Sequence, residues 1–64
     1  MTKEEITAVL NQLKNGEIEE IYVSKEEFLT YREVIVARED FKHFRGIAQR
    51  GGNVVYRYMK EPRS

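Results

Sequence analysis

Cysteine and tryptophan are both absent from this chain of 64 residues, and histidine occurs only once, at position 43. Without cysteine, the chain can form neither a disulfide framework nor a thiolate metal site. The single histidine leaves no recognisable spacing of metal ligands. We therefore expect no metal ion and no cofactor, so packing or association must supply the stability of the fold.

Long apolar runs are also absent. The longest spans residues 34–37, far below the roughly 20 residues that a membrane helix needs. The first residues lack the extended apolar region that is typical of a secretory signal. The sequence therefore predicts a cytoplasmic protein that has no membrane partner.

Proline occurs once, at position 62, so we expect residues 61–64 to be a frayed tail of a single domain, 1–64. A domain this small buries only about 60% of the surface that its unfolded chain exposes. Because no disulfide or metal ion can compensate, we expect the chain to gain buried area as a homo-oligomer.

The two halves of the chain carry opposite charge, although the formal net charge is zero. Residues 1–40 hold five Lys and Arg against ten Asp and Glu, whereas residues 41–64 hold six against one. The halves therefore have net charges of −5 and +5. This split indicates either a charged binding surface or two halves that pair their charges on folding, and we favour the second.

The N-terminal segment has the clearest helix signal. Thr2 and Glu5 have the spacing of a capping box, in which each side chain accepts a hydrogen bond from the other residue's backbone N–H. Gly16 stands where a helix end commonly requires a positive φ. Between them, four apolar residues recur on one helix face: Ile6, Val9, Leu10 and Leu13. The sequence predicts a helix over 3–14.

The next segment predicts a strand over 18–23 with one buried face, because at strand spacing Ile21 and Val23 lie on one side and Glu20 and Tyr22 on the other. Residues 25–39 are compatible with two structures. A second capping box at 24–27 favours a helix, but most residues of 30–36 are β-branched or aromatic. We predict a helical turn over 25–28 and a strand over 30–37, with one continuous helix as the alternative.

Two further elements complete the chain. Asp40 can cap a helix over 41–50, in which apolar residues recur at helical spacing. Gly51 and Gly52 are expected to end this helix. Valine and tyrosine then alternate with other residues, which predicts a strand over 53–59.

The predicted order is α-β-β-α-β, a small α+β fold with two helices and a single-layer three-stranded sheet. The first two strands would pair as an antiparallel hairpin, and the third would return parallel to the second through a right-handed crossover. In the core, we expect the first helix to pack beside three residues of the second: Phe41, Phe44 and Ile47.

No motif predicts catalysis. Residues 46–51 match the G-x-x-x-x-G opening of a phosphate-binding loop, but Gly52 and Asn53 replace the Lys and Ser/Thr that the chemistry needs. His43 follows Asp40 by three residues, an arrangement that an ordinary helix cap explains. Adjacent carboxylates diverge in direction and do not form acid–base pairs by themselves. We therefore expect that the protein is not an enzyme.

One candidate binding surface combines basic and aromatic residues of the predicted last helix and strand: Lys42, Arg45, Arg50, Tyr56, Arg57 and Tyr58. Basic side chains bind phosphates and tyrosines stack on unpaired bases, so a nucleic-acid-binding regulatory protein that uses residues 41–60 is one hypothesis. Our leading hypothesis is a small non-catalytic intracellular protein-interaction module that self-associates. A thin core, exposed sheet edges and the polarised charge favour it.

Overall fold

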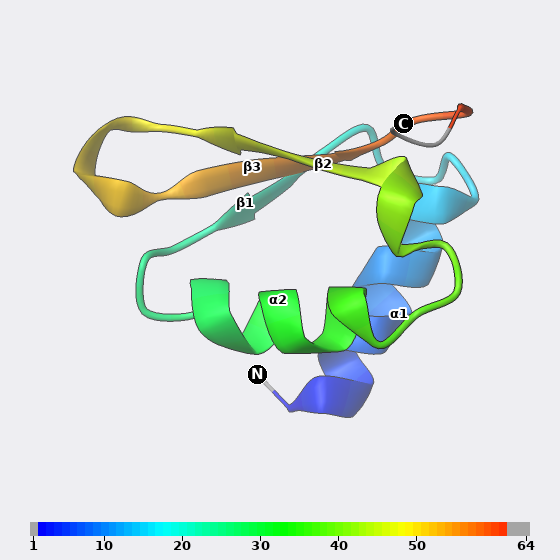
Figure 1. Ribbon diagram of the computed structural model, residues 1–64, viewed down its shortest axis with the longest axis horizontal. Coiled ribbons are helices and arrows are strands. Elements are labelled where there is room, and N and C mark those ends of the chain that lie inside the picture. The colour runs from blue at the N-terminus through cyan, green and yellow to red at the C-terminus, as the bar shows by residue number, and fades with distance from the viewer. Residues whose placement is uncertain (1, 62–64) are drawn as a thin grey trace.

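The computed structural model describes residues 2–61, and residues 62–64 of the predicted tail lie outside this range. The elements are α1 (Lys3–Lys14), β1 (Ile21–Val23), α2 (Phe28–Val36), β2 (Phe44–Ala48) and β3 (Val54–Tyr58). The predicted α+β class, with two helices and a three-stranded sheet, is confirmed. Figure 1 shows the sheet above the two helices. Within the described range, no helix has the length and apolar character needed to cross a membrane.

Helix α1 begins and ends where the sequence predicts. The Oγ1 atom of Thr2 accepts a hydrogen bond from the N–H of Glu5 at 3.1 Å, and the Glu5 carboxylate accepts one from the N–H of Thr2 at 3.0 Å. The bond from the Thr2 backbone lowers the pKa of Glu5. Gly16 follows the helix with a φ of 79°, as its position predicts.

The segment predicted as a strand over 30–37 is helical instead, because α2 occupies Phe28–Val36. Each of its β-branched residues destabilises a helix by only roughly a few tenths of a kcal/mol. Burial of one face of the helix outweighs this cost. Tyr31 and Ile35, which lie four residues apart, are both buried in the core. The helical alternative for 25–39 is therefore correct, although the helix is shorter than that segment.

The segment predicted as a helix over 41–50 contains a strand instead. One 3-10 turn, η1 (Phe41–His43), leads directly into β2. Side chains of β2 alternate between two faces, so Phe44 is buried and Arg45 is exposed. The spacing of apolar residues in this short segment fits both a helix and a strand. Its pairing with β3 makes it a strand.

Gly51 and Gly52 form a hairpin turn and do not end a helix. Their φ angles are 79° and 86°, values that residues with a side chain rarely adopt. The N–H of Gln49 donates to the carbonyl oxygen of Asn53 at 2.8 Å and closes the loop. Strand β3 then follows within the predicted range of 53–59.

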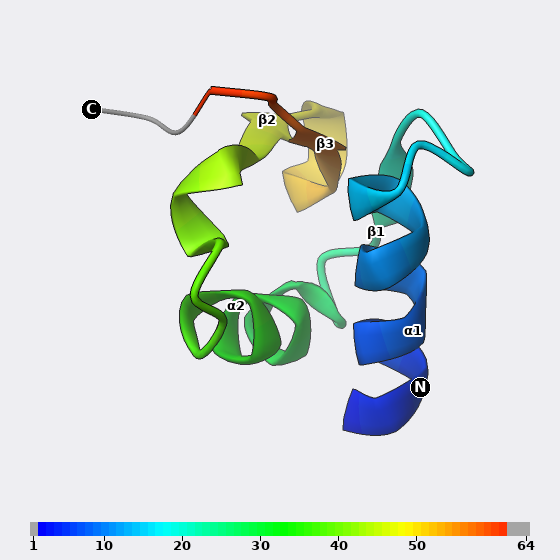
Figure 2. The same ribbon diagram turned by 90° about the vertical axis from the view of Figure 1, so that its right-hand side faces the viewer.

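The sheet has the order β1-β3-β2, and both pairs of neighbouring strands are antiparallel. The predicted hairpin between the first two strands and the predicted parallel return are therefore wrong. Both depended on a strand at 30–37. Strand β3, the last in the sequence, is the centre of the sheet, and Figure 2 shows α2 and β2 on the side of the molecule away from α1.

One core lies between the helices and the inner face of the sheet. Its most buried large side chains are Ile6, Leu10, Val23 and Phe44. The predicted stripe of α1 is confirmed as part of this core, with Val9 packed against it. Of the three later residues predicted to join it, only Phe44 does so. Phe41 is 38% exposed, and Ile47 is half-buried on the opposite face of the sheet, because β2 is a strand.

Candidate functional site

The opposite charges of the two halves are only partly paired. Among the ion pairs of residues 2–61, only the one from Arg57 to Glu20 joins the acidic first 40 residues to the basic remainder. Lys42, Arg45 and Arg50 form no ion pair with described residues. Internal pairing therefore leaves most of the basic charge near β2 available to solvent or a partner.

The sheet face away from the helices carries two rows of side chains. In the first, Arg57 lies directly opposite Arg45 of β2, and its guanidinium donates to Glu20 at 3.0 and 3.3 Å. The second row is Tyr22, Val55 and Ile47. Val55 is only 6% exposed, whereas Tyr22 is 77% exposed. This face therefore offers two cations and one open aromatic ring.

The row that contains Arg57 and Arg45 also contains a carboxylate, that of Glu20. Hydrogen bonds from Tyr22 and from Arg57 hold the pKa of Glu20 below its ordinary value. The same contact with Glu20 raises the pKa of Tyr22. Glu20 is therefore ionised at neutral pH, and its negative charge opposes the approach of phosphate groups to Arg57.

The two tyrosines of the predicted surface point away from its arginines. The ring of Tyr56 is buried and stacks on Phe28 of α2, with ring centroids 6.4 Å apart. Tyr58 stacks on His43 at 5.2 Å and meets the edge of Phe44 at 5.1 Å. The six residues predicted from the sequence thus do not form one surface: Arg45 and Arg57 lie together, Tyr56 and Tyr58 face the helices, and Lys42 and Arg50 lie on η1 and the hairpin loop.

One edge of β2 is unpaired, because among residues 2–61 only β3 lies beside it. The hydrogen bond from the N–H of Gln49 to the carbonyl oxygen of Asn53 determines which residues of β2 are hydrogen-bonded to β3. Hydrogen-bonded positions alternate in an antiparallel pair. The N–H and C=O groups of Gly46 and Ala48 therefore point outward, where another strand can bind them.

An apolar groove of about 400 Å³ lies beside this edge, between α2 and β2. Its apolar side chains are Phe28, Ile35 and Val36 of α2, Phe41 of η1, Phe44 of β2 and Tyr56 of β3. Arg32 is the charged residue in its lining. Gly46 leaves room for the Tyr56 ring, since an added Cβ would lie 3.1 Å from its Cε1 atom. An open edge and an apolar groove together are suited to an extended polypeptide.

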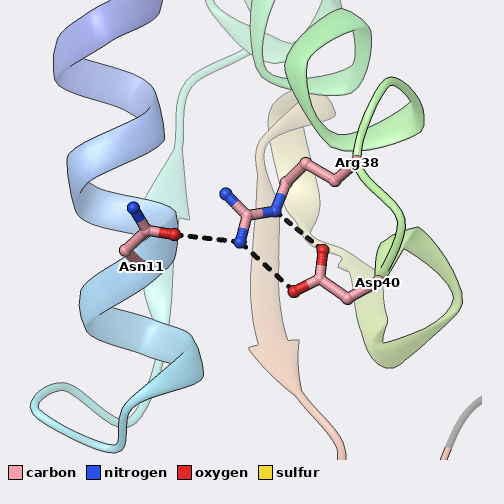
Figure 3. A network of polar contacts seen from close by, with 3 residues as sticks. All are labelled: Asn11, Arg38 and Asp40. Carbon is pink, nitrogen blue, oxygen red and sulfur yellow. Dashed lines mark hydrogen bonds and ion pairs between the residues drawn. The ribbon is translucent and has the colours of Figure 1, made fainter.

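A polar cluster on the other side of η1 is structural (Figure 3). Arg38 donates to the two carboxylate oxygens of Asp40 at 2.8 and 3.2 Å and to the side-chain oxygen of Asn11 at 2.9 Å. The Arg38 hydrogen bonds lower the pKa of Asp40, against the opposing effect of burial. The cluster ties α1 to the segment after α2. In residues 2–61, no group of three acidic or histidine side chains is placed to hold a metal ion.

Neither the groove nor the row that contains Tyr22 is predicted by the sequence. Both depend on strand pairing between distant segments. The alternation around Tyr22 was recognisable, but the exposed face of a strand cannot be assigned until its neighbours are known. Gly46 was the available signal for the groove, because a glycine within an apolar pattern often indicates close packing.

In a comparison with family models, residues 3–57 match a family described as YkzS-like protein. No curated protein and no solved structure matches the chain significantly.

Proposed function

We propose that this chain, which belongs to the YkzS-like protein family, is a small non-catalytic intracellular module that binds other proteins. In this proposal, an extended segment of the partner adds to the free edge of β2. The observation that carries the proposal is the pair of outward-pointing backbone positions, Gly46 and Ala48, beside the groove of about 400 Å³.

Strand addition would use both features. Backbone hydrogen bonds at the edge give affinity, and pockets for alternate side chains give specificity. Every second side chain of an added strand would lie on the helix side of the sheet, above the apolar lining that includes Phe28 and Phe44. The volume falls in the range of roughly 300–1,000 Å³ that is typical of ligand pockets.

Nucleic-acid binding is the second candidate, and the observation that favours it is the exposed group of Arg45, Arg57 and Tyr22 on the open sheet face. It ranks below protein binding because Glu20 neutralises Arg57 and because Tyr56 and Tyr58 are packed against other rings. Affinity for a single-stranded oligonucleotide that falls steeply with salt and is lost in Arg45→Ala would favour this candidate.

Amide hydrogen exchange tests strand addition directly. The probe is the uncharged peptide acetyl-Thr-Val-Thr-Phe-Thr-Val-amide. We expect saturating peptide to slow exchange at Gly46 and Ala48 by about tenfold or more, because their N–H groups become hydrogen-bonded. The N–H of Ile47 already points towards β3 and is the internal control. Unchanged exchange at Gly46 and Ala48 would contradict the proposal.

Two variants provide the matched comparison. Ala48→Pro removes an outward N–H from β2 without removing a bond to β3. Tyr22→Pro makes the same kind of change on the outer edge of β1, since the alternation directs the Tyr22 N–H away from β3. We expect Ala48→Pro alone to lose peptide binding, with circular dichroism confirming that both variants fold. Equal binding by a folded Ala48→Pro protein would also contradict the proposal.

A further inference from the structure

We infer that the segment added to β2 is acidic, with apolar side chains directed into the groove and carboxylates directed to the opposite face, beside Arg45. This inference rests on the proposed function and names the chemistry of the partner. It is carried by the charges that border the free edge.

The first observation is an incomplete row of charges across the sheet. Glu20, which directly precedes β1, Arg57 of β3 and Arg45 of β2 follow one another across the sheet. Arg57 is neutralised by Glu20, but Arg45 has a like charge directly opposite and no ion pair with any described residue. Like charges directly opposite each other destabilise a sheet, and opposite charges stabilise it. A carboxylate on a fourth strand would lie beside Arg45 and complete the row.

The second observation is the sign of the charges around the groove. Arg32 lines it, and none of the described lining residues is a carboxylate. Lys42 precedes β2 and Arg50 follows it, both exposed and without an ion pair among residues 2–61. The nearby Asp40 already accepts two hydrogen bonds from Arg38. The surroundings of the edge therefore attract an acidic segment and repel a basic one.

A folded second copy of this chain fits the site poorly. Its acidic residues Glu19 and Glu20 lead into β1, whose Ile21 and Val23 are buried in its core, so these apolar side chains cannot enter the groove of another copy. Pairing of two β2 edges would bring two Arg45 side chains onto the same face. An extended acidic segment of another protein meets neither obstacle.

Fluorescence anisotropy with three labelled peptides tests the inference. The acidic peptide is acetyl-Glu-Val-Glu-Phe-Glu-Val-amide, and Thr or Lys replaces Glu in the neutral and basic peptides. At about 0.05 M salt we expect the acidic peptide to bind about tenfold tighter than the neutral one, with the basic peptide weakest. At about 0.5 M salt the advantage should fall below about threefold, because salt screens the charges.

Variants locate the effect at Arg45. Arg45→Ala should reduce the preference for the acidic peptide over the neutral one, and Arg45→Glu should reverse this preference. Lys14→Ala, which removes an exposed cation on α1, is the matched control and should change neither affinity.

Each contrary outcome has a distinct meaning. If acidic and neutral peptides bind equally while Gly46 and Ala48 become protected, the charge inference is wrong and strand addition stands. If no peptide protects these amides, the proposed function itself fails. If an oligothymidylate binds more tightly than the acidic peptide and protects no amide of β2, the partner is nucleic acid. If protection of these amides rises with protein concentration alone at about 0.05 M salt, the occupant is a second copy.

Discussion

The interaction between Arg38 and Asp40 depends on pH. Both side chains are only 16% exposed, and the bond between them lowers the pKa of Asp40. A carboxyl group with a lowered folded-state pKa stabilises the fold above its unfolded value of about 3.9. This stabilisation is lost as pH falls through the still lower folded value.

We predict that Asp40→Asn reduces the free energy of unfolding by about 1–3 kcal/mol at neutral pH, because the charge-assisted bonds to Arg38 are weakened. The deficit should shrink as pH falls below about 3.9, where the wild-type carboxylate also becomes protonated. Urea denaturation at neutral and acidic pH measures both. The exposed neighbour Glu39→Gln is the control, and an equal deficit at every pH would contradict this assignment.

Gly46 is the second residue with a specific structural role. A Cβ there would lie 3.1 Å from Cε1 of Tyr56 and 3.4 Å from Cγ1 of Val54. Because the Tyr56 ring is buried, we predict that Gly46→Val lowers the free energy of unfolding by about 1–3 kcal/mol through overpacking. Ala48→Val, an exposed position on the same strand, is the control. A more stable Gly46→Val protein in thermal melts would show that the ring moves aside readily.

At the scale of elements, local signals predicted α1 completely and failed for α2 and β2. The α1 boundaries follow from a cap, a stripe and a glycine that all lie within 2–16. In α2, burial of Tyr31 and Ile35 outweighs the strand preference of its β-branched and aromatic residues. In β2, the deciding factor is its pairing with β3, and Gly51-Gly52 was equally a hairpin signal.

Helix α1 supplies the most buried side chain of the core. Leu10 is 0% exposed, so we predict that Leu10→Ala costs about 2–5 kcal/mol of unfolding free energy. A domain of this size has about 3–10 kcal/mol in total, so thermal unfolding should reveal a large unfolded population. Gln12→Ala, on the exposed side of the same helix, should change stability by less than about 0.5 kcal/mol. Similar melting of Leu10→Ala and wild type would contradict this packing.

At the scale of the whole molecule, the sequence predicted the opposite charges but not the site. Arg45 and Arg57 both belong to the basic surface that the sequence predicts, yet their position opposite each other requires the β2–β3 register. The groove requires α2 and β2 to be neighbours. The sequence instead predicts a strand where α2 lies and a helix where β2 lies. Non-local pairing therefore accounts for what local patterns could not predict.

Self-association stays a prediction. The repulsion between basic β2 edges should keep the chain a monomer of 7.6 kDa at low salt. We expect a dimer population that rises between about 0.05 and 0.5 M salt, as the like charges are screened. Sedimentation equilibrium measures this, and Arg45→Ala should dimerise at lower salt than wild type. A dimer that dissociates as salt increases would instead indicate pairing of acidic and basic surfaces.

The central position of β3 determines when this domain can fold on the ribosome. Neither β1 nor β2 has a neighbouring strand until Val54–Tyr58 has emerged, although α1 can form early because its cap is local. At a synthesis rate of roughly 5–20 residues per second, Ile21 waits seconds for its partner Tyr56. A nascent chain stalled before Val54 therefore lacks a sheet and exposes its apolar helix faces to chaperones and proteases.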